Sequence, residues 1–305
     1  MSDNLVQSLW DDRIGWSRTA DRLKKRYVGG RTVVLGLTVS GAALQTLAAT
    51  VGVASIKTSA GILGAIALVL APFVTRYFLS VEETRKWLRA RSISEGIKSE
   101  IYCFCAKADP YVGADALDIL RAKVREIRGW AKDLELDRAK TGNPSEPAPP
   151  MFDADKYLHA RIYQQINQYY RPKARWNAIL AERFRWTEVT MAGLAAAIGA
   201  VATYAGGDVS ARLGPWAAVL TTVAGSVAAH AAANRYEFQA ATFYATAAQL
   251  DDLAQEWLPS GKAMPGEEWS RFVRSCENVI SAENRGWMAK LDEKSETAST
   301  RPSQP

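Results

Sequence analysis

Residues 32–56, TVVLGLTVSGAALQTLAATVGVASI, form a run of 25 residues without a charged side chain. A second uncharged run, TSAGILGAIALVLAPFVT, follows at 58–75, and only Lys57 separates the two. A helix rises about 1.5 Å per residue, so each run can cross the roughly 30 Å hydrocarbon layer of a bilayer. Two helices joined by a short turn satisfy their backbone groups inside lipid. The sequence therefore predicts a two-span hairpin, with its turn at 54–59.

The same pattern returns in the second half of the chain. Residues 189–207 and 213–234 are uncharged, counting His230 as neutral, and the turn between them is expected at 207–212. These runs are rich in alanine and glycine and only moderately hydrophobic. A buried hairpin in a soluble bundle therefore stays an alternative for this half. The four predicted spans lie at about 33–53, 59–79, 187–206 and 213–233.

Lysine and arginine gather on one side of both hairpins, whereas the turns hold only Lys57 and Arg212. By the positive-inside rule, both termini and the central region are cytosolic. The clusters lie against the span ends and lack a glycine-rich cradle, which favours anionic lipid over a nucleotide or nucleic acid as their partner. The basic residues nearest the span ends are Arg26, Arg31, Arg76, Arg183, Arg185 and Arg235.

The polar parts of the chain carry helical stripes of apolar residues at 115–138, 157–169 and 267–291. The first stripe consists of Leu117, Leu120, Val124, Ile127, Ala131 and Leu134. It offers a surface for contact between chains, as in a short coiled coil. The fold class predicted is an all-α membrane protein, in which two tandem two-span helical hairpins are flanked by cytosolic amphipathic helices.

The domain boundaries follow from a linker and from a repeat. Residues 141–150 contain four prolines and cannot propagate a helix. Arg76-Tyr77 and Arg235-Tyr236 occupy the same place in each half, after the second span of the hairpin. We therefore expect a first two-span domain at 1–140, a linker at 141–151, a second two-span domain at 152–291 and a disordered tail at 292–305.

Residues for chemistry are sparse. The chain has two histidines and three cysteines, and Cys103-x-Cys105 is not zinc spacing. The cysteines are expected to be reduced thiols. No nucleophile elbow, phosphate-binding loop or dinucleotide-binding turn is present in the sequence. The N-terminus carries acids and lacks an apolar core, so no cleavable signal peptide is expected. We predict that the protein is not an enzyme and has no catalytic, cofactor or metal site.

Mild polar residues lie within the spans, namely Gln45, Thr46, Thr221, Thr222, Ser226 and His230. Gln45 is the most costly of them to expose to lipid, so it must face protein or water. Two interpretations stay open for this group, hydrogen bonds between helices and the lining of a pore. Small residues at four-residue spacing include Gly36 and Gly199, which allow close helix packing and favour a homo-oligomer.

This layout resembles the SLATT family, the SMODS and SLOG-associating two-transmembrane effector domains. The resemblance rests on the paired spans and on the helix after each pair. In the first half that helix is WLRARSISEGIKSEIY at 87–102, and in the second it begins NRYEF at 234–238. Two copies would cover nearly the whole chain, similar to the third subtype followed by the first. The resemblance implies a pore-forming effector of bacterial antiviral defence, coupled to nucleotide-signal synthases or sensors.

The function expected is a non-enzymatic effector in the bacterial inner (plasma) membrane, multi-pass and oligomeric, that opens or disrupts the bilayer on a signal. Its expected partners are the lipid bilayer, further copies of the chain, and a nucleotide-signal synthase or sensor protein, without nucleic acid. A membrane scaffold that recruits cytosolic proteins is one alternative. A small ion channel or transporter is another, although no acid or base lies in the middle of a span.

Overall fold

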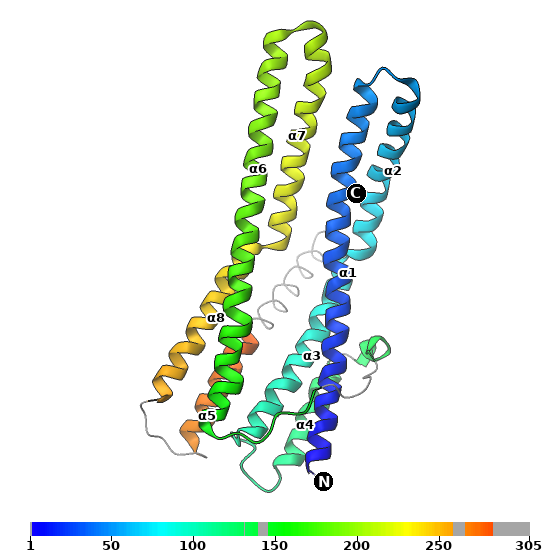
Figure 1. The fold of residues 1–305 in the computed structure, drawn as a ribbon. Coiled ribbons are helices and arrows are strands. Elements are labelled where there is room, and N and C mark those ends of the chain that lie inside the picture. The colour runs from blue at the N-terminus through cyan, green and yellow to red at the C-terminus, as the bar shows by residue number, and fades with distance from the viewer. Residues whose placement is uncertain (1, 131, 140–145, 259–265, 283–305) are drawn as a thin grey trace, which may run out of the picture. The chain divides into compact units, whose positions relative to one another are not determined.

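A computed structural model describes residues 2–130, 132–139, 146–258 and 266–282. Within them the chain is helical and has no strand, which confirms the all-α class (Figure 1). The predicted tail at 292–305 and linker residues 141–145 lie outside the described residues. The helices are α1 (Ser2–Thr50), α2 (Ala54–Phe78), α3 (Val81–Cys105), α4 (Ala116–Gly129), the 3₁₀-helix η1 (Lys132–Asp137), α5 (Ala154–Tyr157), the π-helices η2 (Leu158–Tyr163) and η3 (Gln165–Tyr170), α6 (Arg171–Ala205), α7 (Gly207–Asn234) and α8 (Tyr236–Trp257), followed by helical residues 267–282.

The chain packs as two compact units. Unit 1 comprises Met1–Lys25, Val81–Lys173 and Thr242–Pro305, and unit 2 comprises Arg26–Ser80 and Ala174–Ala241. Unit 2 therefore contains all four predicted spans, and unit 1 contains the helices outside them. These units group residues by contact, whereas the tandem domains predicted at 1–140 and 152–291 describe a duplication, so those boundaries stay a prediction.

Within the described residues, four helical segments are long and apolar enough to cross a membrane, and they overlap the four predicted spans. Large apolar side chains of unit 2 face outward, since Leu63, Val69 and Phe73 of α2 are 57%, 59% and 65% exposed. Water would not tolerate an apolar surface of this extent, whereas lipid tails cover it without cost. The chain is therefore a membrane protein, and the soluble-bundle alternative for α6 and α7 is not favoured.

Both hairpin turns are shorter than predicted and lie earlier in the chain. The first occupies 51–53, between α1 and α2, and the second is Gly206 alone. Lys57 and Asp208 thus lie in the first turns of helices, where a side chain still reaches water beyond the span. Asp208 also faces the positive end of the helix dipole. Gly206 has φ 59° and ψ −168°, a backbone conformation essentially restricted to glycine.

Unit 1 has an aromatic and apolar core. Trp269 is fully buried, its ring contacts the rings of Trp257 and Tyr157, and its indole N–H donates to the carbonyl of Ala106. α4 ends at Gly129 and the 3₁₀-helix η1 continues the predicted apolar stripe. The expectation that this stripe contacts other chains was wrong, because its main members are inside the fold. The buried members are Leu120, Val124, Ile127 and Leu134.

Candidate functional site

The first hairpin is closely packed and contains the only amide predicted inside a span. Gln45 of α1 donates from Nε2 to the carbonyl of Gly61 on α2 at 3.0 Å. Next to this bond, a Cβ on Gly64 would lie 3.1 Å from both the backbone nitrogen of Gln45 and the Cβ of Leu44. The interhelical hydrogen bond, one of the two interpretations left open for Gln45, is therefore present, and it depends on a close helix approach.

Close approach continues along this hairpin. A Cβ on Gly41 would meet Cγ and Cδ2 of Leu68 at 2.7 Å, so this glycine leaves the space that the leucine fills. Gly36, in contrast, has nothing within 4 Å of its Cβ position. Of these two glycines, Gly41 is the one that packs α1 against α2, and the sequence pattern did not distinguish it from Gly36.

The second hairpin is open by comparison. Gly193, Gly214 and Gly225 have nothing within 4 Å of their Cβ positions, and Gly199 meets only the Cβ of Ala217 at 4.0 Å. The polar residues predicted for a packing or pore role bond back to their own helix. These hydroxyl donors are Thr221 to Ala217 O, Thr222 to Ala218 O and Ser226 to Thr222 O. Each hydroxyl is thereby satisfied inside lipid without a partner helix.

Two further predicted polar residues have different surroundings. His230 of α7 lies 5.3 Å from the ring of Phe184, ring centre to ring centre, and Phe184 stacks on Tyr236 at 5.4 Å. Thr46 is half-buried on α1, and its carbonyl accepts the hydroxyl of Thr50. Neither contact decides between packing and pore lining, and the roles of these residues stay predictions.

The basic residues at the span ends do not form one cluster. Arg31 of α1 donates to the carbonyl of Ala233 at 2.6 Å and to Oδ1 of Asn234 at 3.1 Å, and thereby links the first hairpin to the end of α7. The guanidinium of Arg26 lies 5.9 Å over the ring of Phe78. Arg76 and Arg183 are exposed. Arg31 thus has a structural role in unit 2 that the charge pattern alone did not predict.

Unit 1 contains a buried ion pair that sequence reasoning missed. Nε and Nη2 of Arg161 donate to the two carboxylate oxygens of Glu277 at 2.8 and 2.7 Å, and the Tyr157 hydroxyl donates to the same carboxylate at 3.1 Å. The side chains of Arg161 and Glu277 are 1% and 3% exposed. Burial lowers the pKa of Arg161, but the charge of Glu277 outweighs it and leaves the pKa above its ordinary value.

More charges surround this pair. Burial and the neighbouring guanidinium of Arg161 lower the pKa of Lys98 on α3 from 10.5 to about 8. Glu95, one turn earlier, has its pKa lowered, because the positive charges of Lys98 and Arg91 outweigh the effect of burial. The guanidinium of Arg161 also lies 4.2 Å over the ring of Tyr102. Unit 1 therefore holds several charges in its interior, which a polar stripe in a sequence does not reveal.

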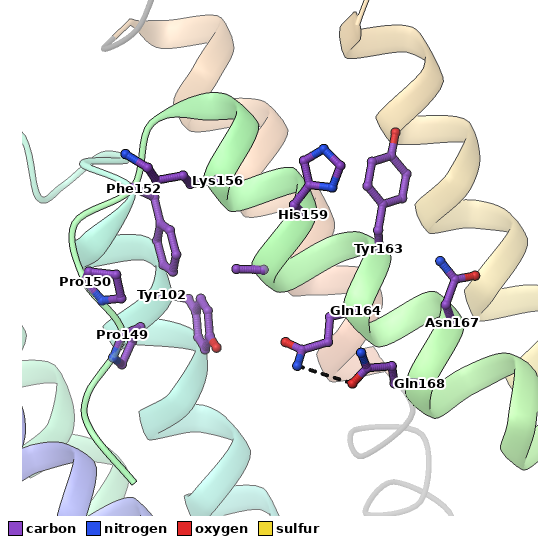
Figure 2. Close-up of a pocket in the computed structure, with 11 residues that line it drawn as sticks. Tyr102, Pro149, Pro150, Phe152, Lys156, His159, Tyr163, Gln164, Asn167 and Gln168 are labelled. Atoms are coloured by element: carbon purple, nitrogen blue, oxygen red, sulfur yellow. Dashed lines mark hydrogen bonds between the residues drawn. The ribbon is translucent and has the colours of Figure 1, made fainter.

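A pocket of 690 Å³ opens beside this cluster along the π-helices η2 and η3 (Figure 2). The rings of Tyr102 and Phe152 stack at 5.7 Å on one side, and on the other Gln164 donates to Gln168 at 3.3 Å. Lys156 adds an ammonium. π-helices, in which residue i is hydrogen-bonded to residue i+5, are rare in proteins overall, but those that occur are often at functional sites. The pocket can hold a small ligand by stacking and amide hydrogen bonds.

The three cysteines are free thiols and all are buried in unit 1. Burial raises the pKa of Cys105 to about 12 and raises the pKa values of Cys103 and Cys276 as well, so thiolate formation is suppressed. Among the residues that the structure describes, no group of three or more His, Cys, Asp or Glu could hold a metal ion.

Residues 157–287, which include the α6–α7 hairpin and both partners of the buried ion pair, match the family described as SMODS and SLOG-associating 2TM effector domain 1. Residues 157–287 are therefore similar to SLATT domains. Residues 14–118 match the family described as Protein of unknown function (DUF4231). Nothing among curated proteins or solved structures matches the chain.

The resemblance to the SLATT family is therefore confirmed. The family is described as a two-transmembrane domain, and two apolar helices lie within the matched residues 157–287. The assignment of the first half to the third SLATT subtype stays a prediction. The SLATT domain contains both the open hairpin and the π-helical wall of the 690 Å³ pocket.

Proposed function

We propose that the chain is a non-enzymatic membrane effector of a bacterial conflict system, which oligomerises and forms a pore or disrupts the bilayer when a partner signals. The observation that carries this proposal is the SLATT match over a hairpin whose apolar surface is exposed. The open glycine positions of that hairpin support oligomerisation, because they leave room for a helix of another copy. A nucleotide-signal synthase or sensor is the proposed source of the signal.

The proposed topology puts both termini and unit 1 in the cytosol, with both turns outside. The basic residues at the opposite ends of the spans from the turns support this orientation. Native cysteines cannot test it, because Cys103, Cys105 and Cys276 are at most 1% exposed and would stay unlabelled on either side.

Introduced cysteines give a usable test. Ser59→Cys and Asp208→Cys are at exposed positions in the second turn of α2 and the first turn of α7, and Asp118→Cys replaces a side chain of α4 that is 79% exposed. A membrane-impermeant thiol reagent applied to intact cells is expected to label the first two and to label Asp118→Cys only after lysis. Labelling of Asp118→Cys in intact cells would invert the topology.

The effector function is tested with purified protein in dye-loaded liposomes and by membrane potential in expressing bacteria. Release of dye or ions, alone or with the products of neighbouring genes, is the expected result, together with growth arrest. An intact membrane under all these conditions would favour a scaffold that recruits proteins to unit 1. If the protein conducts ions steadily and selectively, needs no trigger and does not arrest growth, the ion-channel alternative would be favoured.

A further inference from the structure

A second pocket, of 380 Å³, lies in unit 2 where α6, α7 and α8 meet. We name it the interfacial pocket. Three alanines supply part of its lining, Ala181 from α6 and Ala231 and Ala232 from the end of α7. Because alanine side chains end at Cβ, the two helices leave a hollow here instead of filling it. Part of the lining is therefore apolar.

Two aromatic residues, Tyr236 and Phe238, and four charged side chains complete the lining of the interfacial pocket, and the signs of the four charges balance. Arg185 and Glu188 come from α6, Arg235 follows α7, and Glu237 is in the first turn of α8. Arg185 and Glu237 are 3.9 Å apart and their side chains are 66% and 77% exposed. A pair this long and this exposed adds little to stability. Arg185 and Glu237 can thus separate, and each side chain can then pair with an opposite charge of a ligand.

The backbone at this pocket is held in an uncommon conformation. Arg235 has φ 53° and ψ 41°, the left-handed region, and its N–H caps α7 by donating to Ala231 O and Ala232 O. The left-handed region is sterically unfavourable for a residue with a Cβ. The turn starts α8 at Tyr236 and sets the guanidinium of Arg235 over the ring of Phe238 at 4.3 Å. Such strain is found at ligand-binding positions.

Aromatic side chains indicate the depth of the interfacial pocket in a membrane. Trp186, beside Arg185, is 63% exposed, and Phe184 stacks on Tyr236 and contacts His230. Tryptophan and tyrosine concentrate where the hydrocarbon meets the headgroups. The uncharged stretch of α6 begins directly after Glu188. The pocket is therefore at headgroup level if the hairpins span the bilayer.

We propose that the interfacial pocket binds the headgroup of a zwitterionic phospholipid with a primary ammonium, of the phosphatidylethanolamine type. The phosphate is held by Arg185 and Arg235, and the ammonium by Glu188 and Glu237. A primary ammonium has three N–H donors for the two carboxylates, whereas a trimethylated one has none. An anionic headgroup has no positive group to pair with Glu188 and Glu237, and its negative charge would repel both carboxylates. This differs from the general attraction of basic clusters to anionic lipid, and it rests on the proposed membrane insertion.

The protein is placed in nanodiscs that contain equal amounts of ethanolamine, choline and glycerol phospholipids. After extraction, the lipids that remain bound to the protein are identified by mass. Native mass spectrometry is expected to show about tenfold enrichment of the ethanolamine lipid, the ratio that one charge-assisted hydrogen bond provides. Equal retention of ethanolamine and choline lipids by the unaltered protein would overturn the proposal.

Variants separate the two halves of the headgroup. Glu237→Gln is expected to lower the ethanolamine-to-choline ratio toward one, and Arg235→Gln to reduce retention of all three lipids. Arg76→Gln changes the matching arginine of the first hairpin, which is exposed, and serves as the control. Thermal melting monitored by circular dichroism verifies that each variant is folded. A lipid profile in folded Arg235→Gln and Glu237→Gln equal to that of the unaltered protein would also refute the site.

A further arm distinguishes a lipid from a soluble ligand of the same chemistry. Glycerophosphoethanolamine carries the headgroup without acyl chains, and it is expected not to compete at millimolar concentration. Full displacement of the lipid by it would assign the pocket to a soluble phosphate ester instead. Lipid retention is measured without any pore assay, so absence of dye release leaves this result intact, whereas a protein outside the membrane fraction would end both proposals.

Discussion

The interiors of unit 1 and unit 2 contain different kinds of side chain. Unit 1 buries whole charges with their partners, such as Arg161 with Glu277, among large aromatic rings. Unit 2 packs with glycine and alanine, and its large apolar side chains face outward. In water, burial of large apolar side chains stabilises the fold, whereas in lipid it gives no such gain. Helices in lipid therefore associate through close packing and hydrogen bonds. The difference shows which solvent each unit faces.

A second comparison lies inside unit 2. The first hairpin is held by Gly41, Gly64 and the Gln45–Gly61 hydrogen bond, whereas the second has open glycine positions and hydroxyls that bond to their own helix. The same two-span pattern thus gives one closed and one open pair of helices. The open pair is the one within the SLATT domain.

The largest effect is expected from Glu277→Gln in unit 1. The substitution leaves Arg161 buried without a counter-charge, and breaking a buried pair in this way costs about 3–5 kcal/mol. Urea unfolding followed by the fluorescence of buried Trp269 measures it. Glu267→Gln is the matched control, because its partner Arg271 and Glu267 itself are 68% and 88% exposed. Similar midpoints for both variants would mean that the interior of unit 1 does not depend on this pair.

The next effect concerns Lys98 and pH. The folded-state pKa of about 8 lies below the ordinary 10.5, so folding carries a penalty in full below pH 8, which is relieved as pH rises from about 8 to 10.5. The charges that act on Lys98 belong to Arg161, Glu95, Arg13 and Glu277. Lys98→Met is expected to raise the free energy of unfolding at pH 7 by at most about 3 kcal/mol and to remove this rise.

The control for Lys98 is Lys123→Met, at a half-exposed position of α4. Buried cysteines act in the opposite direction, because their raised pKa values cost stability as pH rises above 9. The difference between Lys98→Met and the unaltered protein across pH 7–11 therefore isolates the lysine. Parallel curves would show that Lys98 is not desolvated in the fold.

In unit 2, Gly41→Leu is expected to destabilise the first hairpin by about 1–3 kcal/mol, because even its Cβ would overlap Leu68. Gly36→Leu on the same helix has open space and is expected to leave the hairpin intact. Disulfide trapping between cysteines introduced into α1 and α2 reports the packing. Addition of Leu68→Ala to Gly41→Leu is expected to restore trapping, and a failure to restore it would argue against this contact.

Oligomerisation is expected to respond to the opposite set of glycines. Gly36→Leu and Gly199→Leu would weaken a homo-oligomer in nanodiscs by blocking helix approach from another copy, while each hairpin stays formed. Mass photometry over a range of protein concentrations measures the state. A strictly monomeric particle for the unaltered protein would remove this role from both residues.

The smallest effect is expected from Gln45→Leu. Loss of one interhelical hydrogen bond in lipid costs about 1 kcal/mol. If Gln45 only joins α1 to α2, the variant lowers the stability of the first hairpin and leaves ion leakage per inserted protein unchanged. Reduced leakage from liposomes at equal insertion would instead place Gln45 on a conducting path.

The sequence by itself determined the solvent of each part of the chain. Uncharged runs such as 32–56 specify spans because burial in lipid penalises every charge, whatever the tertiary contacts are. The helical class, the SLATT resemblance and the side that carries the basic residues follow from the same pattern. Local geometry was less determined, since both turns fell earlier than predicted, at 51–53 and Gly206. Charges such as Lys57 and Asp208 fit into a helix's first turn as well as into a loop.

Only the tertiary structure decided which of many similar residues meet. Gly41 packs and Gly36 does not, although both lie among small residues of one helix. Arg161 and Glu277 are 116 positions apart in the sequence, so no local residue spacing predicts their ion pair. The two π-helices shift which side chains of 158–170 turn inward, burying Tyr170 where an α-helical stripe indicates Tyr169. The balanced charges of the interfacial pocket likewise come from three helices, because a site assembled by packing leaves no period in the sequence.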